Sequence, residues 1–175
     1  MNTQTYFILF LLFLQGCAEK GDIATSTLPN FVLIMADDLG YEGLSCYGNR
    51  VLKTPHLDEL AQYGLRFTDF HSNGSVCTPT RAALLTGKYQ QRVGMEGVIY
   101  VKPPSRSLGM DTSVVTMAEL LKTKGYQTGV FGKWHLGYEM EYHPNLQGFD
   151  EFYGYLSGNV DYHTHYDNAG IYDWW

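Results

Sequence analysis

The chain has 175 residues, of which 45% are hydrophobic and 17% are charged, and its net charge is -6. This length suits a single globular domain, and the apolar fraction is too high for a disordered chain. The basic residues are dispersed rather than clustered, which argues against nucleic acid as a partner. An acidic protein can still act on an anionic substrate, because a site depends on its local field and not on the net charge.

A nearly uninterrupted apolar run covers residues 6–14 and leads into Leu14-Gln15-Gly16-Cys17. The run is too short to span a bilayer and is typical of an export signal. Its end resembles a bacterial lipoprotein cleavage site, which predicts a signal over residues 1–16, a lipid on Cys17 and a tether over residues 17–28. Gln15 is atypical there and the first six residues hold no Lys or Arg, so an ordinary signal or an uncleaved apolar N-terminus is the alternative. The expected location is the periplasm or the cell surface, with the lipid as the only membrane attachment.

The folded part, residues 29–175, begins with a predicted strand. Residues 30–36 form a continuous apolar run, which favours a strand buried on both faces of a parallel sheet. Asp37 and Asp38 follow directly, and ligands of open α/β sheets gather at the carboxyl ends of strands. Two carboxylates there suit a hard cation, although a pair of turn aspartates would give the same pattern.

Helical and extended patterns then alternate along the chain. Residues 54–64 predict a helix, with Thr at the cap, Pro in the first turn and Gly at the end. Residues 65–70 predict a second strand, and a polar turn over residues 71–76 leads to Cys77. A second helix is expected from near Pro79 to Gly87.

The remaining elements complete the expected fold class. Residues 88–111 are rich in Gly and Pro and predict a long loop that lines the site. Residues 116–125 predict a helix opened by a capping box between Thr116 and Glu119, and residues 126–131 predict a strand. The alternation of strands and helices predicts an α/β fold.

Four short segments, in this order, carry a recognisable family pattern. They are Asp37-Asp38, Cys77-Thr78-Pro79-Thr80-Arg81 with the Leu-Leu-Thr-Gly that follows it, Gly132-Lys133-Trp134-His135-Leu136-Gly137, and Gly148-Phe149-Asp150-Glu151-Phe152-Tyr153-Gly154. Together they resemble the N-terminal part of a formylglycine-dependent sulfatase of the arylsulfatase type. The resemblance implies an alkaline-phosphatase-like sandwich, in which helices flank a mostly parallel central sheet that is incomplete in this chain.

The resemblance also implies a chemistry for Cys77. In this family a maturation enzyme oxidises the motif cysteine to formylglycine, whose hydrated aldehyde attacks the sulfur of a sulfate ester. A second hydroxyl then expels the sulfate by elimination, which divides one difficult step into two. By resemblance, Asp37, Asp38 and the modified Cys77 would hold Ca²⁺ or Mg²⁺. Without the resemblance, Cys77 would be interpreted as a small buried hydrophobe.

Three further residues receive roles from the same resemblance. Arg81 would hold the nucleophile and its sulfated form, Lys133 would bind sulfate oxygens, and His135 would contact the formylglycine hydroxyl and act as a base. Lys133 and His135 alternate along an extended segment, so both are expected on one side with Trp134 on the other. A packed histidine hydrogen-bonded to the backbone is the alternative for His135. Lys88 follows the motif helix closely enough to approach the site.

The C-terminal part of the chain is expected to face the substrate. Residues 161–168 contain His163 and His165, which favour a substrate-pocket loop over a transition-metal pair because no further ligands lie at a suitable spacing. Aromatic residues nearby, Tyr162, Tyr166 and Trp174, would suit stacking on a sugar or aryl ring or packing in a core. Asp167-Asn168 resembles the family's later metal-ligand pair in letters only.

The sequence therefore predicts a sulfuric ester hydrolase that acts on an aryl sulfate or a sulfated glycan. The family's later ligand pair and its distal histidine and lysine have no counterpart before Trp175, so the chain by itself is expected to show little turnover. Two alternatives are a phosphatase or phosphonate hydrolase of the same superfamily and a truncated, noncatalytic glycan-binding lipoprotein.

Overall fold

The computed structural model describes residues 28–175, which fall into two units divided between Ala36 and Asp37. The predicted signal over residues 1–16, Cys17 and nearly all of the tether lie outside the described residues. Within the described part, no helix is both long and apolar enough to cross a membrane.

The predicted strand over residues 30–36 is not a strand in the structure. The segment has no regular secondary structure, and its side chains are exposed, with 86% of Val32 and 84% of Ile34 accessible. A strand buried on both faces needs neighbouring strands on each side, and the one sheet among the described residues contains two other strands. Asp37 and Asp38 therefore follow an irregular segment rather than a strand end.

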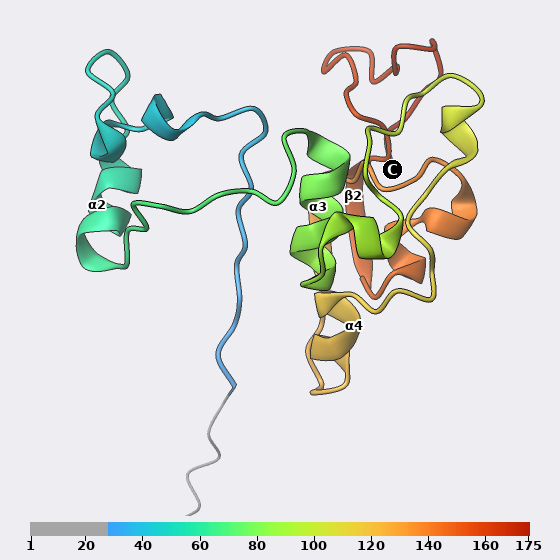
Figure 1. Ribbon diagram of the computed structural model, residues 1–175, viewed down its shortest axis with the longest axis horizontal. Coiled ribbons are helices and arrows are strands. Elements are labelled where there is room, and N and C mark those ends of the chain that lie inside the picture. The colour runs from blue at the N-terminus through green and yellow to red at the C-terminus, as the bar shows by residue number, and fades with distance from the viewer. Residues whose placement is uncertain (1–27) are drawn as a thin grey trace, which may run out of the picture. The chain divides into compact units, whose positions relative to one another are not determined.

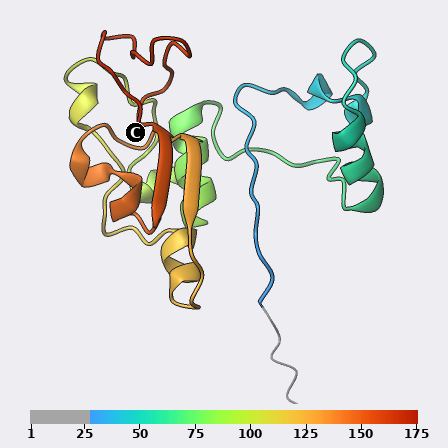
Figure 2. The ribbon, with the colours of Figure 1, turned by 180° about the vertical axis from the view of Figure 1, so that it is seen from behind.

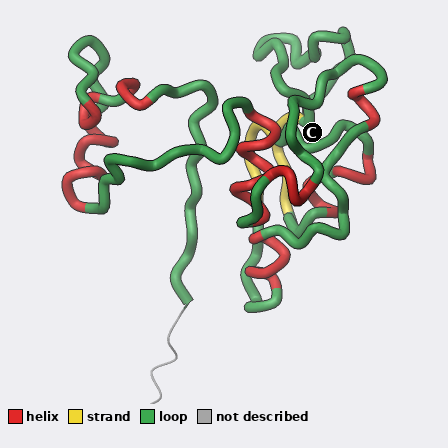
Figure 3. Tube along the Cα trace, viewed as in Figure 1, coloured by secondary structure: helices red, strands yellow, loops and turns green. Residues whose placement is uncertain are grey.

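The second unit, from Asp37 to Trp175, contains all the regular elements described, which Figure 1 colours in chain order and Figure 3 colours by type. The helices and strands are α2 (Pro55–Tyr63), α3 (Cys77–Thr86), α4 (Met117–Lys122), β1 (Gly129–Lys133) and β2 (Glu151–Tyr155). Six 3-10 turns accompany them: η1 (Tyr41–Gly43), η2 (Ser45–Tyr47), η3 (Gln90–Val93), η4 (Ser105–Ser107), η5 (Met140–Tyr142) and η6 (Pro144–Leu146).

All three predicted helices are present. Helix α2 begins after Thr54, and its Asp58 carboxylate accepts hydrogen bonds from the Ser45 hydroxyl at 2.6 Å and the Cys46 N–H at 2.8 Å, which ties the helix to η2. Helix α3 begins two residues before the expected Pro79 and ends at Gly87, whose φ of 63° is the left-handed conformation that glycine favours at this cap.

Helix α4 has the capping box that its sequence predicts. The Thr116 hydroxyl accepts from the Glu119 N–H at 3.2 Å, and the Glu119 carboxylate accepts from the Thr116 N–H at 2.7 Å. These two bonds satisfy backbone donors that a helix start would otherwise leave open.

The predicted strands differ more from the structure. Residues 65–70 form no strand, and β1 begins three residues later than the predicted 126–131. Strand β2, which overlaps the fourth motif segment and was not predicted, pairs with β1 in parallel, with Lys133 opposite Tyr155. Figures 1 and 2 show α3 against one face of this sheet.

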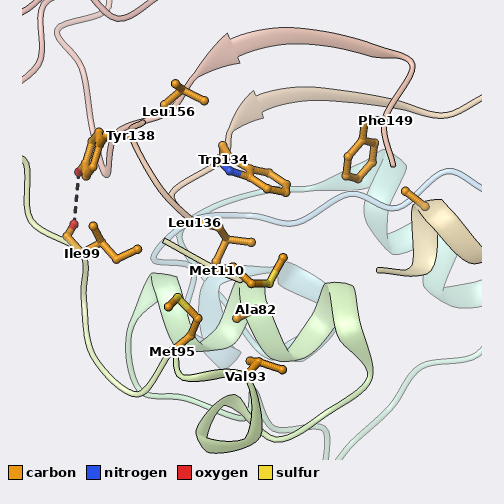
Figure 4. Packing of buried hydrophobic residues seen from close by; sticks show 11 residues of the cluster. Ala82, Val93, Met95, Ile99, Met110, Trp134, Leu136, Tyr138, Phe149 and Leu156 are labelled. Carbon is orange, nitrogen blue, oxygen red and sulfur yellow. Dashed lines mark hydrogen bonds between the residues drawn. The ribbon is translucent and has the colours of Figure 1, made fainter. Parts of the chain in front are cut away.

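The core lies between α3 and the sheet. Its buried cluster includes Ala82 from α3, Met110, Leu156 and the motif residues Trp134 and Leu136 (Figure 4). Trp134 meets Phe149 edge to face, with ring centroids 5.9 Å apart. The fold is therefore of the predicted α/β class, a parallel sheet with helices packed on it, and its core fixes the segment that carries Lys133 and His135.

Candidate active site

Cys77 is the first residue of α3, and Val76 precedes it as the cap. A helix of ten residues directs its first N–H groups and the positive end of its dipole toward this position. The side chain is half-buried and forms no disulfide. Arg81 lies one turn further along the same helix, so Cys77 and Arg81 lie on the same face at the start of the helix.

Asp37, Arg81 and Lys133 meet in the structure although they are far apart in sequence. The Lys133 ammonium donates to Asp37 Oδ2 at 2.8 Å, and an Arg81 guanidinium nitrogen lies 3.5 Å from Asp37 Oδ1. Arg81 also donates to the backbone carbonyl of Lys133 at 2.7 Å. The two cationic side chains are 8% and 13% exposed for Lys133 and Arg81, whereas that of Asp37 is 44% exposed.

The carboxylate of Asp37 is held in its charged form. Burial by itself would raise the pKa, but the hydrogen bond from Lys133 and the charges of Lys133 and Arg81 outweigh it, so the pKa lies below 3.8. The Nε of Arg81 is buried and has no hydrogen-bond partner among the described residues. An uncommitted guanidinium donor next to a lysine is suited to binding an anion.

His135 lies deeper than the other predicted site residues and is 2% exposed. Its Nε2 is 2.8 Å from the Ile99 carbonyl oxygen, and its Nδ1 is buried without a partner in the described part of the chain. Burial lowers the pKa of His135 to about 4, and the positive charges of Lys133 and Arg81 add to the effect. The ring is thus neutral at pH 7 and within electrostatic reach of the charged cluster.

The expected alternation of Lys133 and His135 along an extended segment is wrong. Strand β1 ends at Lys133, and His135 has a φ of 58°, which is left-handed. The turn sends the imidazole toward Ile99, while Trp134 packs in the core as expected.

Two residues named from the sequence form no hydrogen bond or ion pair with this cluster. Asp38 is exposed, has a φ of 54°, and makes no hydrogen bond or ion pair with the described residues. Lys88 is exposed and lies beyond the C-terminal end of α3, whose length from Cys77 to Thr86 is about 14 Å. The structure therefore does not bring Lys88 to the site.

The C-terminal loop is tied to the rest of the unit by two carboxylates. Asp167 is buried and forms an ion pair with Arg106 at 3.1 Å, so its carboxylate already has a charged partner. Asp173 accepts from the backbone N–H groups of Leu156 and Ser157 at 3.0 and 2.7 Å. His165 stacks on Trp174 with ring centroids 4.4 Å apart, whereas His163 is exposed.

The donors for a metal are only partly present in the described residues. No group of three or more His, Cys, Asp or Glu side chains forms a metal-binding cluster there. The carboxylate of Asp37 is nevertheless a hard oxygen donor kept in its charged form, and that of Asp38 is uncommitted. The chemistry of these donors fits Ca²⁺ or Mg²⁺, which bind oxygen ligands.

Several residues of the site had no clear signal in the sequence. The Thr78 hydroxyl donates to the His135 carbonyl at 3.1 Å, and Ile99 contributes a backbone carbonyl that no side-chain pattern reveals. Tyr155 could only be placed through the unpredicted pairing of β2 with β1. The loop over residues 88–111 was expected to line the site. In the structure it contributes the Ile99 carbonyl, which contacts His135.

Comparison with known proteins identifies the family of the chain. The profile of the family described as Sulfatase matches residues 29–173. The chain belongs to the sulfatase family. Human arylsulfatase A is 52% identical over 139 residues, covering 78% of this chain and 27% of that protein. Mouse steryl-sulfatase is 48% identical over 142 residues, covering 75% of this chain and 23% of that protein. The chain thus spans about a quarter of the length of these sulfatases.

Solved sulfatase structures share the fold. The crystal structure of Ps i-CgsB superposes with a TM-score of 0.70 at 39% identity, covering 74% of this chain and 28% of that one. The putative sulfatase yidJ from Bacteroides fragilis gives a TM-score of 0.68 at 30% identity, covering 84% of this chain and 36% of that one. These similarities agree with the alkaline-phosphatase-like class expected from the sequence.

Proposed function

We propose that the protein hydrolyses sulfate monoesters, with Cys77 as the precursor of its nucleophile. The observation that carries the proposal is the meeting of Asp37, Arg81 and Lys133 beside the helix that starts with Cys77. Family membership supports the reaction class. A maturation enzyme would convert Cys77 to formylglycine, which supplies a hydrated aldehyde as the nucleophile.

Arg81 and Lys133 provide the positive field for the sulfate group. Their charged groups are largely shielded from water, so their attraction for an anion is weakly screened. Arg81 is fixed by its hydrogen bond to the Lys133 carbonyl, which leaves its buried Nε free to donate. Donors that are already oriented need no reorganisation as negative charge develops.

A divalent cation, Ca²⁺ or Mg²⁺, would be held by Asp37 and Asp38 together with the modified Cys77. It would supply a Lewis acid that draws charge from a sulfate oxygen. Lys133 and Arg81 keep Asp37 ionised, so this ligand is available over the whole neutral range. His135, neutral at pH 7, serves as the proton acceptor of the site.

The alcohol part of the substrate is proposed to be a sugar or an aryl group. Tyr155 lies opposite Lys133 in the sheet, and its hydroxyl is 3.5 Å from that of the exposed Tyr162. Trp174 stacks on Tyr155 with centroids 6.0 Å apart. Tyr155 itself is buried, so the exposed ring of Tyr162 is the one available to stack on a sugar or aryl ring. One related sulfatase, Ps i-CgsB, has been crystallised in complex with k-i-k-neocarrahexaose.

The test is a parallel assay of the full protein, matured in a host that oxidises the motif cysteine. Aryl sulfate, a sulfated oligosaccharide and an aryl phosphate are compared at equal concentration. Sulfate release that Cys77→Ala abolishes and Cys46→Ala preserves is expected, since Cys46 contacts Asp58 and Arg66 rather than the charged cluster. Faster release of phosphate than of sulfate would instead identify a phosphatase of the same superfamily.

The location follows from the N-terminal sequence alone. We propose export to the periplasm or the cell surface with a lipid on Cys17. Incorporation of a labelled fatty acid that Cys17→Ser prevents would support the anchor, and release of an unlabelled mature protein would contradict it.

A further inference from the structure

The two ring nitrogens of His135 have different environments. Nε2 lies 2.8 Å from the Ile99 carbonyl oxygen, whereas Nδ1 is buried and has no partner in the described part of the chain. A carbonyl oxygen can only accept a hydrogen bond, so Nε2 must carry the proton. In a neutral imidazole Nδ1 is then the acceptor. An unsatisfied acceptor inside a protein is costly, so Nδ1 is available to a partner outside the described residues.

Tyr138 fixes the carbonyl that holds the ring. Its hydroxyl donates to the same Ile99 oxygen at 3.2 Å, drawn as the dashed line in Figure 4, and accepts from the Gly158 N–H at 3.4 Å. Burial raises the pKa of Tyr138 to about 12, so the hydroxyl stays a donor at neutral pH. The Tyr138 and His135 rings also meet edge to face, with centroids 6.4 Å apart.

Gly158 leaves the space that the imidazole occupies. A Cβ at this position would lie 2.7 Å from Cε1 and 2.9 Å from Nε2 of His135. Real Cβ atoms do not approach other atoms so closely, so any side chain at residue 158 would displace the ring from the Ile99 carbonyl.

The backbone of His135 is fixed by its neighbours. Its left-handed conformation is unfavourable for a residue with a Cβ. It is held by the His135 N–H, which donates to the Leu156 carbonyl at 3.1 Å, and by the Thr78 hydroxyl, which donates to the His135 carbonyl at 3.1 Å. Thr78 directly follows Cys77, so the start of α3 and the histidine are positioned together.

We propose that Ile99, Tyr138 and Gly158 are positioning residues that hold His135 as the tautomer protonated on Nε2 and present Nδ1 as the proton acceptor of the site. The inference rests on the proposed function for the role of that acceptor. In the transfer, an O–H bond at the reacting group breaks, its electron pair stays on oxygen, and the proton bonds to the Nδ1 lone pair. The Nε2–H bond to Ile99 is unchanged, so the ring does not have to turn during the reaction.

The direct test is nitrogen NMR of the full protein labelled with ¹⁵N-histidine, recorded at pH 7 without substrate. The His135 signal is assigned by its loss in His135→Gln. A protonated Nε2 and an unprotonated Nδ1 are expected. A protonated Nδ1, or two protonated nitrogens, would overturn the proposal. Because no turnover is measured, this result does not depend on whether the protein cleaves sulfate esters.

Gly158→Ala links the tautomer to turnover. The added methyl group should displace the ring, mix the two tautomers in the spectrum and lower kcat about a hundredfold, as expected for a misplaced catalytic group. Gly97→Ala is the matched control, because a Cβ there meets no atom within 4 Å. An unchanged spectrum and kcat in folded Gly158→Ala would contradict the proposal.

Tyr138→Phe gives a second, smaller change that keeps the ring and removes only the hydroxyl. It should lower kcat about tenfold with little change in KM, because the acceptor is misaligned while sulfate binding is retained. A kcat equal to that of the wild type would contradict the proposal that Tyr138 positions His135, and this variant can be measured even where Gly158→Ala does not fold.

Discussion

Arg81 joins helix α3 to the segment that carries Lys133, because its guanidinium contacts both the Lys133 carbonyl and the Asp37 carboxylate. Its planar fork can serve two acceptors while its buried Nε remains available. A lysine at this position would keep the positive charge but would have only one nitrogen that can donate hydrogen bonds.

Arg81→Lys should therefore lower kcat/KM for a sulfate ester by about a hundredfold, the typical loss when one preorganised donor to a developing charge is removed. The comparison is steady-state kinetics beside Arg92→Lys, which alters an exposed arginine of η3. Equal losses in the two variants would show that Arg81 has no special place in the site.

His135 predicts how stability depends on pH. Its pKa is about 4 in the folded protein and 6.5 in the unfolded chain, so between these values the unfolded state binds a proton that the folded state does not. The free energy of unfolding should fall by about 3 kcal/mol as the pH is lowered from 6.5 to 4, and this contribution is complete above pH 6.5.

Denaturant unfolding at a series of pH values measures this contribution. The difference between wild type and His135→Gln should change across the interval, whereas replacing the exposed His163 by Gln should leave the pH dependence as it is. Parallel curves for wild type and His135→Gln would show that His135 does not titrate with a lowered pKa.

Sequence patterns named the charged residues of the candidate site but not the residues that support them. The motif identified Arg81 and Lys133, and the structure brings them together with Asp37. Ile99 contributes its backbone carbonyl, and any residue type would have that group, so the sequence could not indicate this role. The turn at His135 was missed because a left-handed conformation at a histidine depends on contacts with Thr78 and Leu156 that are distant in sequence.

At the level of elements, helix α4 shows how a local signal becomes tertiary structure. The Thr116 hydroxyl accepts from Glu119 within the capping box and also donates to the Gln147 carbonyl at 2.8 Å, and Thr116 is fully buried. One side chain therefore starts the helix and attaches it to the segment that leads into β2.

Thr116→Ala should lower the free energy of unfolding by about 2 kcal/mol, because the helix loses its cap and a buried carbonyl loses its donor. Thr116→Ser keeps the hydroxyl and should lose clearly less. Chemical denaturation of both variants checks the prediction, and equal destabilisation would assign the effect to the lost methyl group instead.

Helices were predicted more accurately than strands for a physical reason. Caps and end glycines, such as Thr116 and Gly87, are local and can be read from a few residues. A strand forms only when it pairs with another strand. An apolar run indicates that a segment tends to be buried, but it does not identify the strand with which the segment pairs. Residues 30–36 have the run but belong to no sheet of the described part, whereas β2 has partners that its own sequence does not reveal.

For the molecule as a whole, metal dependence separates the proposed chemistry from simple anion binding. Removal of divalent cations by a chelator should abolish sulfate release, and added Ca²⁺ or Mg²⁺ should restore it. Asp38→Asn should require a higher metal concentration for the same recovery, since a neutral amide is a weaker ligand than a carboxylate. Full activity in the presence of chelator would exclude a role for the cation.

The chemical state of Cys77 in protein from its native source tests the proposed mechanism most directly. Mass spectrometry of the tryptic peptide covering residues 67–81, which contains Cys77 and ends at Arg81, distinguishes a thiol from an aldehyde. We predict an aldehyde at this position, which would place the nucleophile at the start of α3 beside Arg81. A thiol in every copy of the peptide would contradict the mechanism, because the proposed nucleophile would then be absent.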